Sequence, residues 1–168
     1  MPFSTLNTTI LAPPAVCFDL SRSVDLHQVS TAQTEEKAIK GVVAGLMELG
    51  DSVTWEAKHL SFRQRLSSHI TAFERPYSFA DEMLTGAFKS FRHVHRFEVL
   101  AGGATRMTDV FHYTSPLGVL GKLADYLFLK QYMTYLLLER NRVIKEVAES
   151  GKWQEVPFSL TVVQHFML

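Results

Sequence analysis

The 168-residue sequence lacks several features that would place a protein in a class at once. Its single cysteine, Cys17, cannot form an intramolecular disulfide, and we expect a small buried hydrophobe on a helix rather than a reactive thiol. No run approaches the ~18 consecutive apolar residues that a membrane-spanning helix needs. The opening residues, MPFSTLNTTIL, lack the charged region and apolar core of a signal peptide, which favours a cytoplasmic protein.

An excess of charge of one sign is also missing. Lysine and arginine together number 17, and so do aspartate and glutamate, which gives a formal net charge of zero. Nucleic acids and anionic membranes usually select a basic surface, so neither is expected as a partner. The stretch FKSFRHVHRF (88–97) interleaves aromatic and basic residues as an RNA-binding strand does, but the two alternating faces of a strand explain this more simply.

Catalytic and cofactor motifs are missing as well. The sequence contains no Gly-x-Ser-x-Gly elbow and no phosphate-binding glycine loop, and AGGA (101–104) is typical of a hairpin turn. We therefore expect no cofactor. What is present, 46% hydrophobic and 20% charged residues, is the composition of an ordinary globular protein of one domain.

The chain opens with a strand and two short helices. Residues 3–11 alternate and are rich in β-branched residues, which predicts a strand. Pro14 suits the first turn of a helix over 15–23, and a second short helix is predicted over 24–30. Segments of strand length with short turns between them then predict consecutive antiparallel strands at 38–49, 52–60, 63–73, 77–84, 88–100 and 104–114.

A long helix is predicted after Pro116, from Gly118 to about Glu149, with Gly151 as its C-terminal cap. The charged stretch LERNRVIKEVAES (138–150) predicts a solvated face at its end. The helix carries an apolar stripe that comprises Leu129, Tyr132, Met133, Leu136, Val143, Ile144 and Val147.

This order of elements predicts an α+β fold of the helix-grip type. A curved antiparallel sheet of about seven strands wraps around the long C-terminal helix, and two short helices follow the first strand. A single apolar helix can cover such a sheet only by lying across its concave face. Sheet and helix then enclose a cavity, which is a common way to build a small-molecule site.

Several stretches resemble one known superfamily. They are STAQT (30–34), GDSVTWEAKH (50–59), ITAFERPYSFADEM (70–83), GAFKSFRHVHRFE (86–98), MTDVFHY (107–113), SPLGVLGKLAD (115–125) and ERNRVIKEVAE (139–149). Together they resemble the START-like or Bet v 1-like helix-grip superfamily (SRPBCC), and within it bacterial ligand-binding proteins of cyclase/dehydrase-like or cell-division-inhibitor type. The resemblance implies an internal hydrophobic pocket in a domain over 1–150. The tail at 151–168 departs from the family pattern.

Strand alternation predicts which side chains face that pocket. The stretch LSSHITAF (66–73) is ambiguous, because Leu66 and Ile70 compete with His69 and Phe73 for the inner face. The other strands give an inward set of Val53, Trp55, Ala57, His59, Tyr77, Phe79, Asp81, Met83, Phe91, His93, His95, Phe97, Val99, Met107, Asp109, Phe111 and Tyr113.

Ionisable groups on an apolar inner face need partners, and three interpretations of His59, His93, His95 and Asp109 are open. In the first, they form a polar network in which each group has a hydrogen-bond partner. In the second, they orient a ligand in a hydrophobic pocket. In the third, they bind a metal or perform acid–base chemistry. For a metal, His93-x-His95 puts two imidazoles on one face, and Asp109 or His59 would complete the site. That spacing is weakly specific, so no metal site and no catalytic residue is assigned.

The sequence as a whole favours binding of a small hydrophobic or amphipathic ligand between the sheet and the C-terminal helix. The alternatives are a cyclase, dehydratase or hydrolase that uses a pocket histidine–aspartate pair, with His93, His95 and Asp109 as candidates, and a regulatory module whose tail binds another chain, a homodimer included. The predicted ligand-binding residues are Trp55, His59, Phe79, Met83, Phe91, His93, His95, Phe97, Met107, Asp109, Phe111, Tyr113, Leu127 and Met133.

Overall fold

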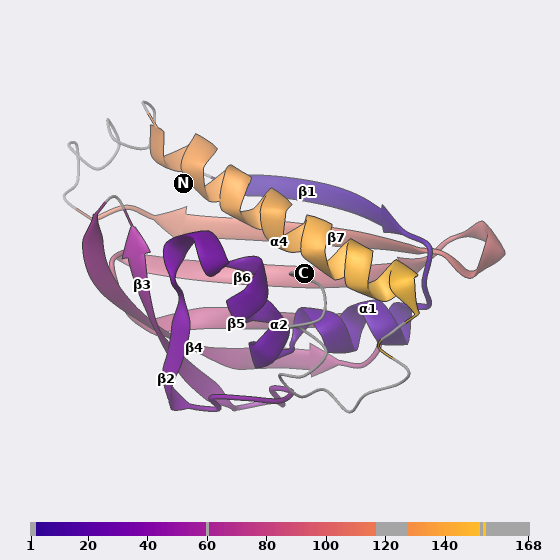
Figure 1. Cartoon of the computed structure of the whole chain (residues 1–168), viewed down its shortest axis with the longest axis horizontal. Coiled ribbons are helices and arrows are strands. Elements are labelled where there is room, and N and C mark those ends of the chain that lie inside the picture. Colours follow the sequence, from indigo (N-terminus) through magenta and orange to yellow (C-terminus); the bar gives the residue numbers. More distant parts are fainter. Residues whose placement is uncertain (1–2, 60, 117–127, 152, 154–168) are drawn as a thin grey trace.

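The computed structural model describes residues 3–59, 61–116, 128–151 and 153. In this part of the chain seven strands form one antiparallel sheet in the order β1-β7-β6-β5-β4-β3-β2 (Figure 1). Six strands follow one another as a meander, and the first strand closes the far edge beside the last. The strands are β1 (Phe3–Ile10), β2 (Lys37–Gly41), β3 (Ser52–His59), β4 (Phe62–Glu74), β5 (Ser78–Thr85), β6 (Ser90–Val99) and β7 (Thr105–Thr114).

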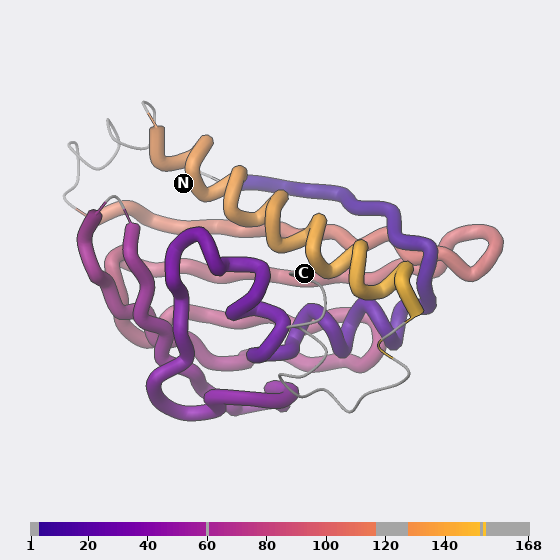
Figure 2. The backbone as a smooth tube through the Cα atoms, in the orientation of Figure 1, coloured from indigo at the N-terminus to yellow at the C-terminus, as the bar shows by residue number. Residues whose placement is uncertain are grey.

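Among the described residues, three α-helices lie on one face of this sheet (Figure 2). They are α1 (Pro14–Ser21), α2 (Val24–Ser30) and α4 (Lys130–Ser150), and the short 3₁₀ turns are η1 (Ala32–Thr34) and η2 (Ala101–Gly103). The long helix contacts β1, α1 and α2. The predicted helix-grip architecture is thereby confirmed.

Local signals in the sequence account for where these helices begin and end. Pro14 stands in the first turn of α1, where its missing N–H is no loss. The Ser23 side chain caps α2 by accepting a hydrogen bond from the backbone N–H of Leu26. Gly151 ends α4 with a φ of 71°, a left-handed conformation that glycine adopts without strain. The described helices include none that is long and apolar enough to cross a membrane.

An aromatic core joins α1 to the sheet. The Phe18 ring meets the rings of Phe73, Phe79 and Phe97 edge to face at centroid distances of 5.2, 5.3 and 5.5 Å. Cys17 is fully buried beside it, and burial raises the pKa of its thiol. The prediction of a small buried hydrophobe rather than a reactive thiol is confirmed.

The predicted alternation fails at two strand ends. Tyr77 is 56% exposed because it lies in the turn before β5, where its N–H donates to the carbonyl of Glu74 and the alternation of a strand does not apply. Val99 is 64% exposed because it ends β6 at the β6–β7 turn, which extends beyond the end of α4 (Figure 1). Neither side chain faces the interior, and both predictions are wrong.

The ambiguity in β4 is resolved by a β-bulge. Ile70 pairs with Asp81 and Ala72 with Ala80, so Thr71 is an extra residue with no β5 residue directly opposite it. The alternation shifts at this point, which lets both Ile70 and Phe73 pack in the main core. The pattern that places Leu66 and Ile70 inward is therefore correct before the bulge, and the pattern that places Phe73 inward is correct after it.

The strand predicted over 38–49 is much shorter in the structure, because β2 ends at Gly41. Gly41 has a φ of 79°, and an added Cβ there would lie 2.1 Å from the carbonyl oxygen of Ser52. Only glycine fits this close approach, and the chain leaves the sheet. The next segment instead buries Met47 in the core. The predicted helix start at Gly118 and most of the 151–168 tail lie outside the described residues.

Candidate functional site

Register across β5, β6 and β7 gathers ionisable side chains on the helix-facing side of the sheet. Asp81 on β5 lies directly opposite His93 on β6. His95, two residues further along β6, lies opposite Asp109 on β7. Each histidine thus has a carboxylate beside it on one neighbouring strand and a second carboxylate diagonally across the other strand.

Asp109 is the centre of this group and is completely buried. Its Oδ1 lies 3.0 Å from Nε2 of His93 and 2.7 Å from Nδ1 of His95, although the second contact is not aligned as a hydrogen bond. From α4, Arg140 Nη1 donates to Oδ1 at 3.5 Å and Asn141 Nδ2 donates to Oδ2 at 2.7 Å. We call Asp81, His93, His95, Asp109, Arg140 and Asn141 the Asp109 cluster.

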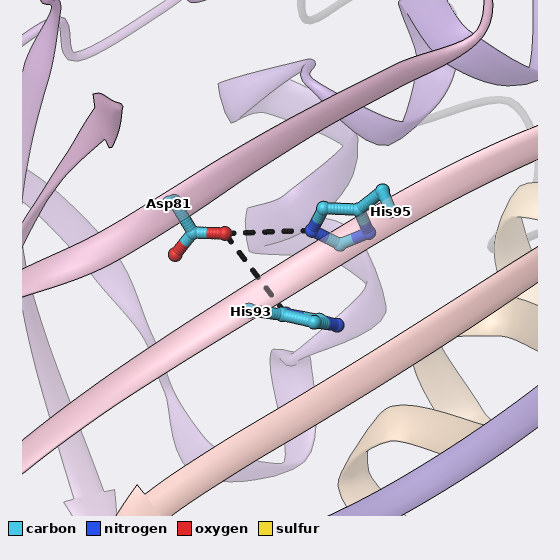
Figure 3. Close-up of side chains that lie close together, drawn as sticks. All are labelled: Asp81, His93 and His95. Atoms are coloured by element: carbon cyan, nitrogen blue, oxygen red, sulfur yellow. Dashed lines mark hydrogen bonds and ion pairs between the residues drawn. The ribbon is translucent and has the colours of Figure 1, made fainter. Parts of the chain in front are cut away.

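Asp81 closes the cluster on its other side (Figure 3). Its Oδ1 lies 3.4 Å from Nε2 of His95 and 4.0 Å from Nδ1 of His93. The side chain is 20% exposed, whereas that of Asp109 is fully enclosed. The histidines therefore stand between a buried carboxylate and a partly accessible one.

Burial and neighbouring charges set the protonation of these groups. Burial alone would raise the pKa of Asp109, but its contacts with His93 and His95 outweigh that effect and hold the pKa well below its usual range. The pKa of Asp81 is lowered in the same way, against burial, by its hydrogen bond with His95 and by nearby positive charge. Burial, with the charge of His95, lowers the pKa of His93 to about 4, so His93 is neutral at pH 7.

The cluster borders a cavity of about 320 Å³ between the sheet and the helices. Asp81, His93, His95 and Arg140 contribute the polar part of its wall on this side. Much of the remaining wall is apolar and comes from the sheet, α4 and the segment before β6, and includes Val53, Trp55, Ala57, Leu66, Ile70, Phe79, Phe88, Phe91, Phe111, Met133, Leu136 and Leu137.

A second polar group lines the same cavity. Nδ1 of His59 lies 2.8 Å from the hydroxyl of Tyr132 on α4, and Nε2 of His27 lies 3.5 Å from a carboxylate oxygen of Glu36. The His27 ring packs against the ring of Trp55 at a centroid distance of 4.3 Å, tilted by 36°. Burial would raise the pKa of Glu36, but His27 and then His59 lower it overall. We call His27, Glu36, His59 and Tyr132 the Glu36 cluster.

The predicted site residues fall into several places. Trp55, His59, Phe79, Phe91, His93, His95, Phe111 and Met133 line the cavity. Phe97 and Met107 pack in the main core, and Met83 and Tyr113 in a smaller cluster with Phe91. Asp109 lies behind the histidines, and Leu127 lies outside the described residues. His59 pairs with Tyr132 and is not part of the group with metal-ligand spacing found in the described chain, which is Asp81, His93 and His95.

Arg140 and Asn141 are members of the Asp109 cluster that sequence reasoning missed. They were expected on the solvated face of the helix, but they are 6% and 1% exposed. Arg140 Nη2 also donates to the carbonyl of Ser21 at 2.9 Å, which ties α4 to the end of α1. Their spacing from Leu137 and Ile144 places these four positions on one side of a helix, a signal that gives the side but not its burial.

Comparison with known proteins supports the fold. No family model and no curated protein sequence matches the chain. Among solved structures, the protein TTHA0849 from Thermus thermophilus has a TM-score of 0.67 at 15% identity over 88% of this chain and 99% of that one. Major latex-like protein 151 from Panax ginseng scores 0.65 at 16% identity over 88% and 97%. Ara h 8.0201 scores 0.58 at 12% identity over 85% and 97%. The helix-grip fold is confirmed, and membership of the SRPBCC superfamily and of its bacterial subfamily stays a prediction.

Proposed function

We propose that this helix-grip protein binds a small, mainly apolar molecule that carries a polar group, within the cavity between the sheet and α4. The observation that carries the proposal is the cavity wall, where aromatic and aliphatic side chains surround two separate polar clusters. Apolar surface supplies affinity and a few placed polar groups supply orientation, which is how small-molecule sites are usually built. The stretches that resemble bacterial ligand-binding SRPBCC proteins agree with this function.

The size of the cavity narrows the class of ligand. At about 320 Å³ it lies near the lower end of the roughly 300–1,000 Å³ typical of ligand pockets. This favours a compact molecule over an extended acyl chain. A hydroxyl, carbonyl or carboxylate on the ligand would find donors in Arg140, Tyr132 or a histidine of the wall.

A cavity-filling variant tests the proposal directly. Ala57 lines the cavity from β3, while the adjacent Lys58 is exposed on the opposite face. With 1-anilinonaphthalene-8-sulfonate as the fluorescent probe, we expect saturable binding to the wild type and at least a tenfold loss of affinity in Ala57→Phe. Lys58→Phe, the matched control, should keep the wild-type affinity. Equal affinities in all three proteins, each with an intact cooperative unfolding transition, would refute the proposal.

A second candidate function is an enzyme of the cyclase, dehydratase or hydrolase type. The observation that favours it is the pair formed by His93 and the buried Asp109 at the cavity wall, with Nε2 and Oδ1 3.0 Å apart. Against it, a histidine with a pKa of about 4 is a weak base at pH 7. Turnover of an aromatic, polyketide-like substrate that is lost in His93→Ala while probe binding persists would support the enzyme. Unchanged turnover in that variant would remove this candidate.

A further inference from the structure

We propose that Asp81, His93 and His95 bind a divalent transition-metal ion at the wall of the cavity. Their ligand atoms, one per residue, all lie within 4.8 Å of one another. They come from two paired strands, and the three side chains converge in Figure 3. Histidine nitrogens together with a carboxylate oxygen are a common donor set for such ions. The proposal concerns a metal and does not depend on which organic ligand the cavity binds.

The ring nitrogens of the two histidines are divided between the two carboxylates. An aspartate carboxylate is acceptor-only, so His93 Nε2, 3.0 Å from Asp109 Oδ1, donates its hydrogen to that carboxylate. The other ring nitrogen of His93, Nδ1, lies 4.0 Å from Asp81 Oδ1, and Nε2 of His95 lies 3.4 Å from the same oxygen, at hydrogen-bond distance. A metal ion bound at this point would take the place of the hydrogen that His95 shares with Asp81.

Asp109 supplies the support that a metal site needs behind its ligands. A metal-binding histidine usually gives its other ring N–H to a carboxylate, which fixes the tautomer and the ring orientation. Here Asp109 Oδ1 accepts a hydrogen bond from His93 and contacts Nδ1 of His95, and Oδ2 accepts a hydrogen bond from Asn141. The nearest cation, Arg140, is engaged with Asp109, Asn141 and the carbonyl of Ser21. We therefore assign Asp109 a positioning role and not a place among the ligands.

Distances and chemistry indicate which ions fit. Donors at about 2.0–2.2 Å from a tetrahedral zinc ion lie about 3.4 Å from one another. Asp81 Oδ1 and His95 Nε2 are already 3.4 Å apart, and the 4.0 Å between Asp81 Oδ1 and His93 Nδ1 would have to shorten when an ion binds. Magnesium and calcium prefer sites built wholly from oxygen, so two imidazoles favour zinc or a neighbouring first-row ion. Three protein ligands leave a coordination position open toward the cavity.

The test titrates zinc sulfate into metal-free protein without a histidine tag and follows the heat of binding. We expect one equivalent to bind the wild type with submicromolar affinity, and magnesium chloride to give no binding. Asp81→Asn and His95→Gln should each weaken zinc binding at least tenfold. Asp109→Asn should weaken it roughly 10- to 100-fold without changing the stoichiometry. His59→Gln is the matched control, because His59 lines the same cavity outside the group, and it should bind zinc like the wild type.

Two outcomes would overturn the metal site. One is the absence of zinc binding to the wild type, which would mean that a proton alone bridges these groups. The other is zinc binding that is weakened by His59→Gln and not by His95→Gln. Because substitutions in this cluster can unfold the protein, histidine ring ¹⁵N shifts of the wild type provide a second measurement: zinc must shift His93 and His95 and leave His59 in place. Probe binding by metal-free protein separates failure of this site from failure of the cavity function.

Discussion

The two polar clusters of the cavity are held in different ways. Four members of the Asp109 cluster stand on three adjacent strands and two on α4, and its central carboxylate is fully enclosed and meets four side chains. The Glu36 cluster is assembled from α2, the end of β3, α4 and the residue before β2, and the Glu36 side chain stays 12% exposed with its His27 contact at 3.5 Å. Sheet register therefore encloses the carboxylate of Asp109, whereas the carboxylate of Glu36, held at helix and loop positions, stays nearer water.

Removal of the central carboxylate is expected to have the largest effect. Asp109→Ala leaves Arg140 buried without its countercharge, and the loss of one partner from a buried ion pair lowers the free energy of unfolding by about 3–5 kcal/mol. Urea unfolding followed by circular dichroism measures the change. Asp109→Asn keeps a hydrogen-bond acceptor and should be milder. A loss below about 1 kcal/mol in Asp109→Ala would mean that the network contributes little to stability.

Acid should distinguish the clusters by the pH at which each loses stability. The pKa of His93 falls from 6.5 to about 4 on folding, so between these values the unfolded chain binds a proton that the folded protein does not. Stability therefore drops by up to about 3 kcal/mol as the pH falls from 6.5 to 4. The pKa of Glu36 is lowered from 4.5, so its contribution is lost only below that pH.

Stability curves of wild type and His93→Gln between pH 7 and 4 test this difference. The free energy of unfolding of His93→Gln should change less with pH across that window. In this variant the unfolded chain no longer binds a proton at position 93 that the folded protein lacks. Equal slopes in the two proteins would contradict the assigned protonation of His93.

A smaller effect is expected in the more exposed cluster. Glu36→Gln removes the charge that faces His27 while the side-chain shape is kept, and we expect a loss of about 1.5 kcal/mol at pH 7. Urea unfolding at pH 7 provides the measurement. If Glu36→Gln destabilised as much as Asp109→Ala, the contrast between the clusters would be lost.

The smallest effect is expected from Tyr132→Phe. It removes one hydroxyl, 2.8 Å from His59 Nδ1, and leaves the ring in place. A loss of about 1 kcal/mol or less in thermal or urea unfolding follows from the net value of one hydrogen bond. A larger loss of free energy of unfolding would mean that the Glu36 cluster acts as one cooperative unit, as the Asp109 cluster does.

The strand part of the site follows from the sequence because a strand has a period of two. That period put Phe91, His93 and His95 on one face, and likewise Asp109 and Phe111, and all five are buried. The prediction failed for Tyr77, which lies in a turn and not in a strand, and for Val99, which lies at a strand end that no helix covers; both are exposed. Periodicity specifies a face but not what lies over it.

The helix part of the site could not be read in the same way. Arg140 belongs to a locally charged stretch, and its burial depends on Asp109, which is distant in the sequence and meets it only after the sheet forms. Tertiary partners decide such positions, and a single sequence does not display them.

The extra residue at Thr71 changes which side chains of β4 face the helices. Before it Ile70 lines the cavity, and after it Phe73 meets the ring of Phe18 in the main core. Without the added residue, one of the two would turn toward water. A single insertion in one strand thus keeps both segments of β4 packed against the apolar interior. Substitution of residue 71 should therefore be tolerated better than its deletion, because the number of residues in β4 sets which side chains face inward.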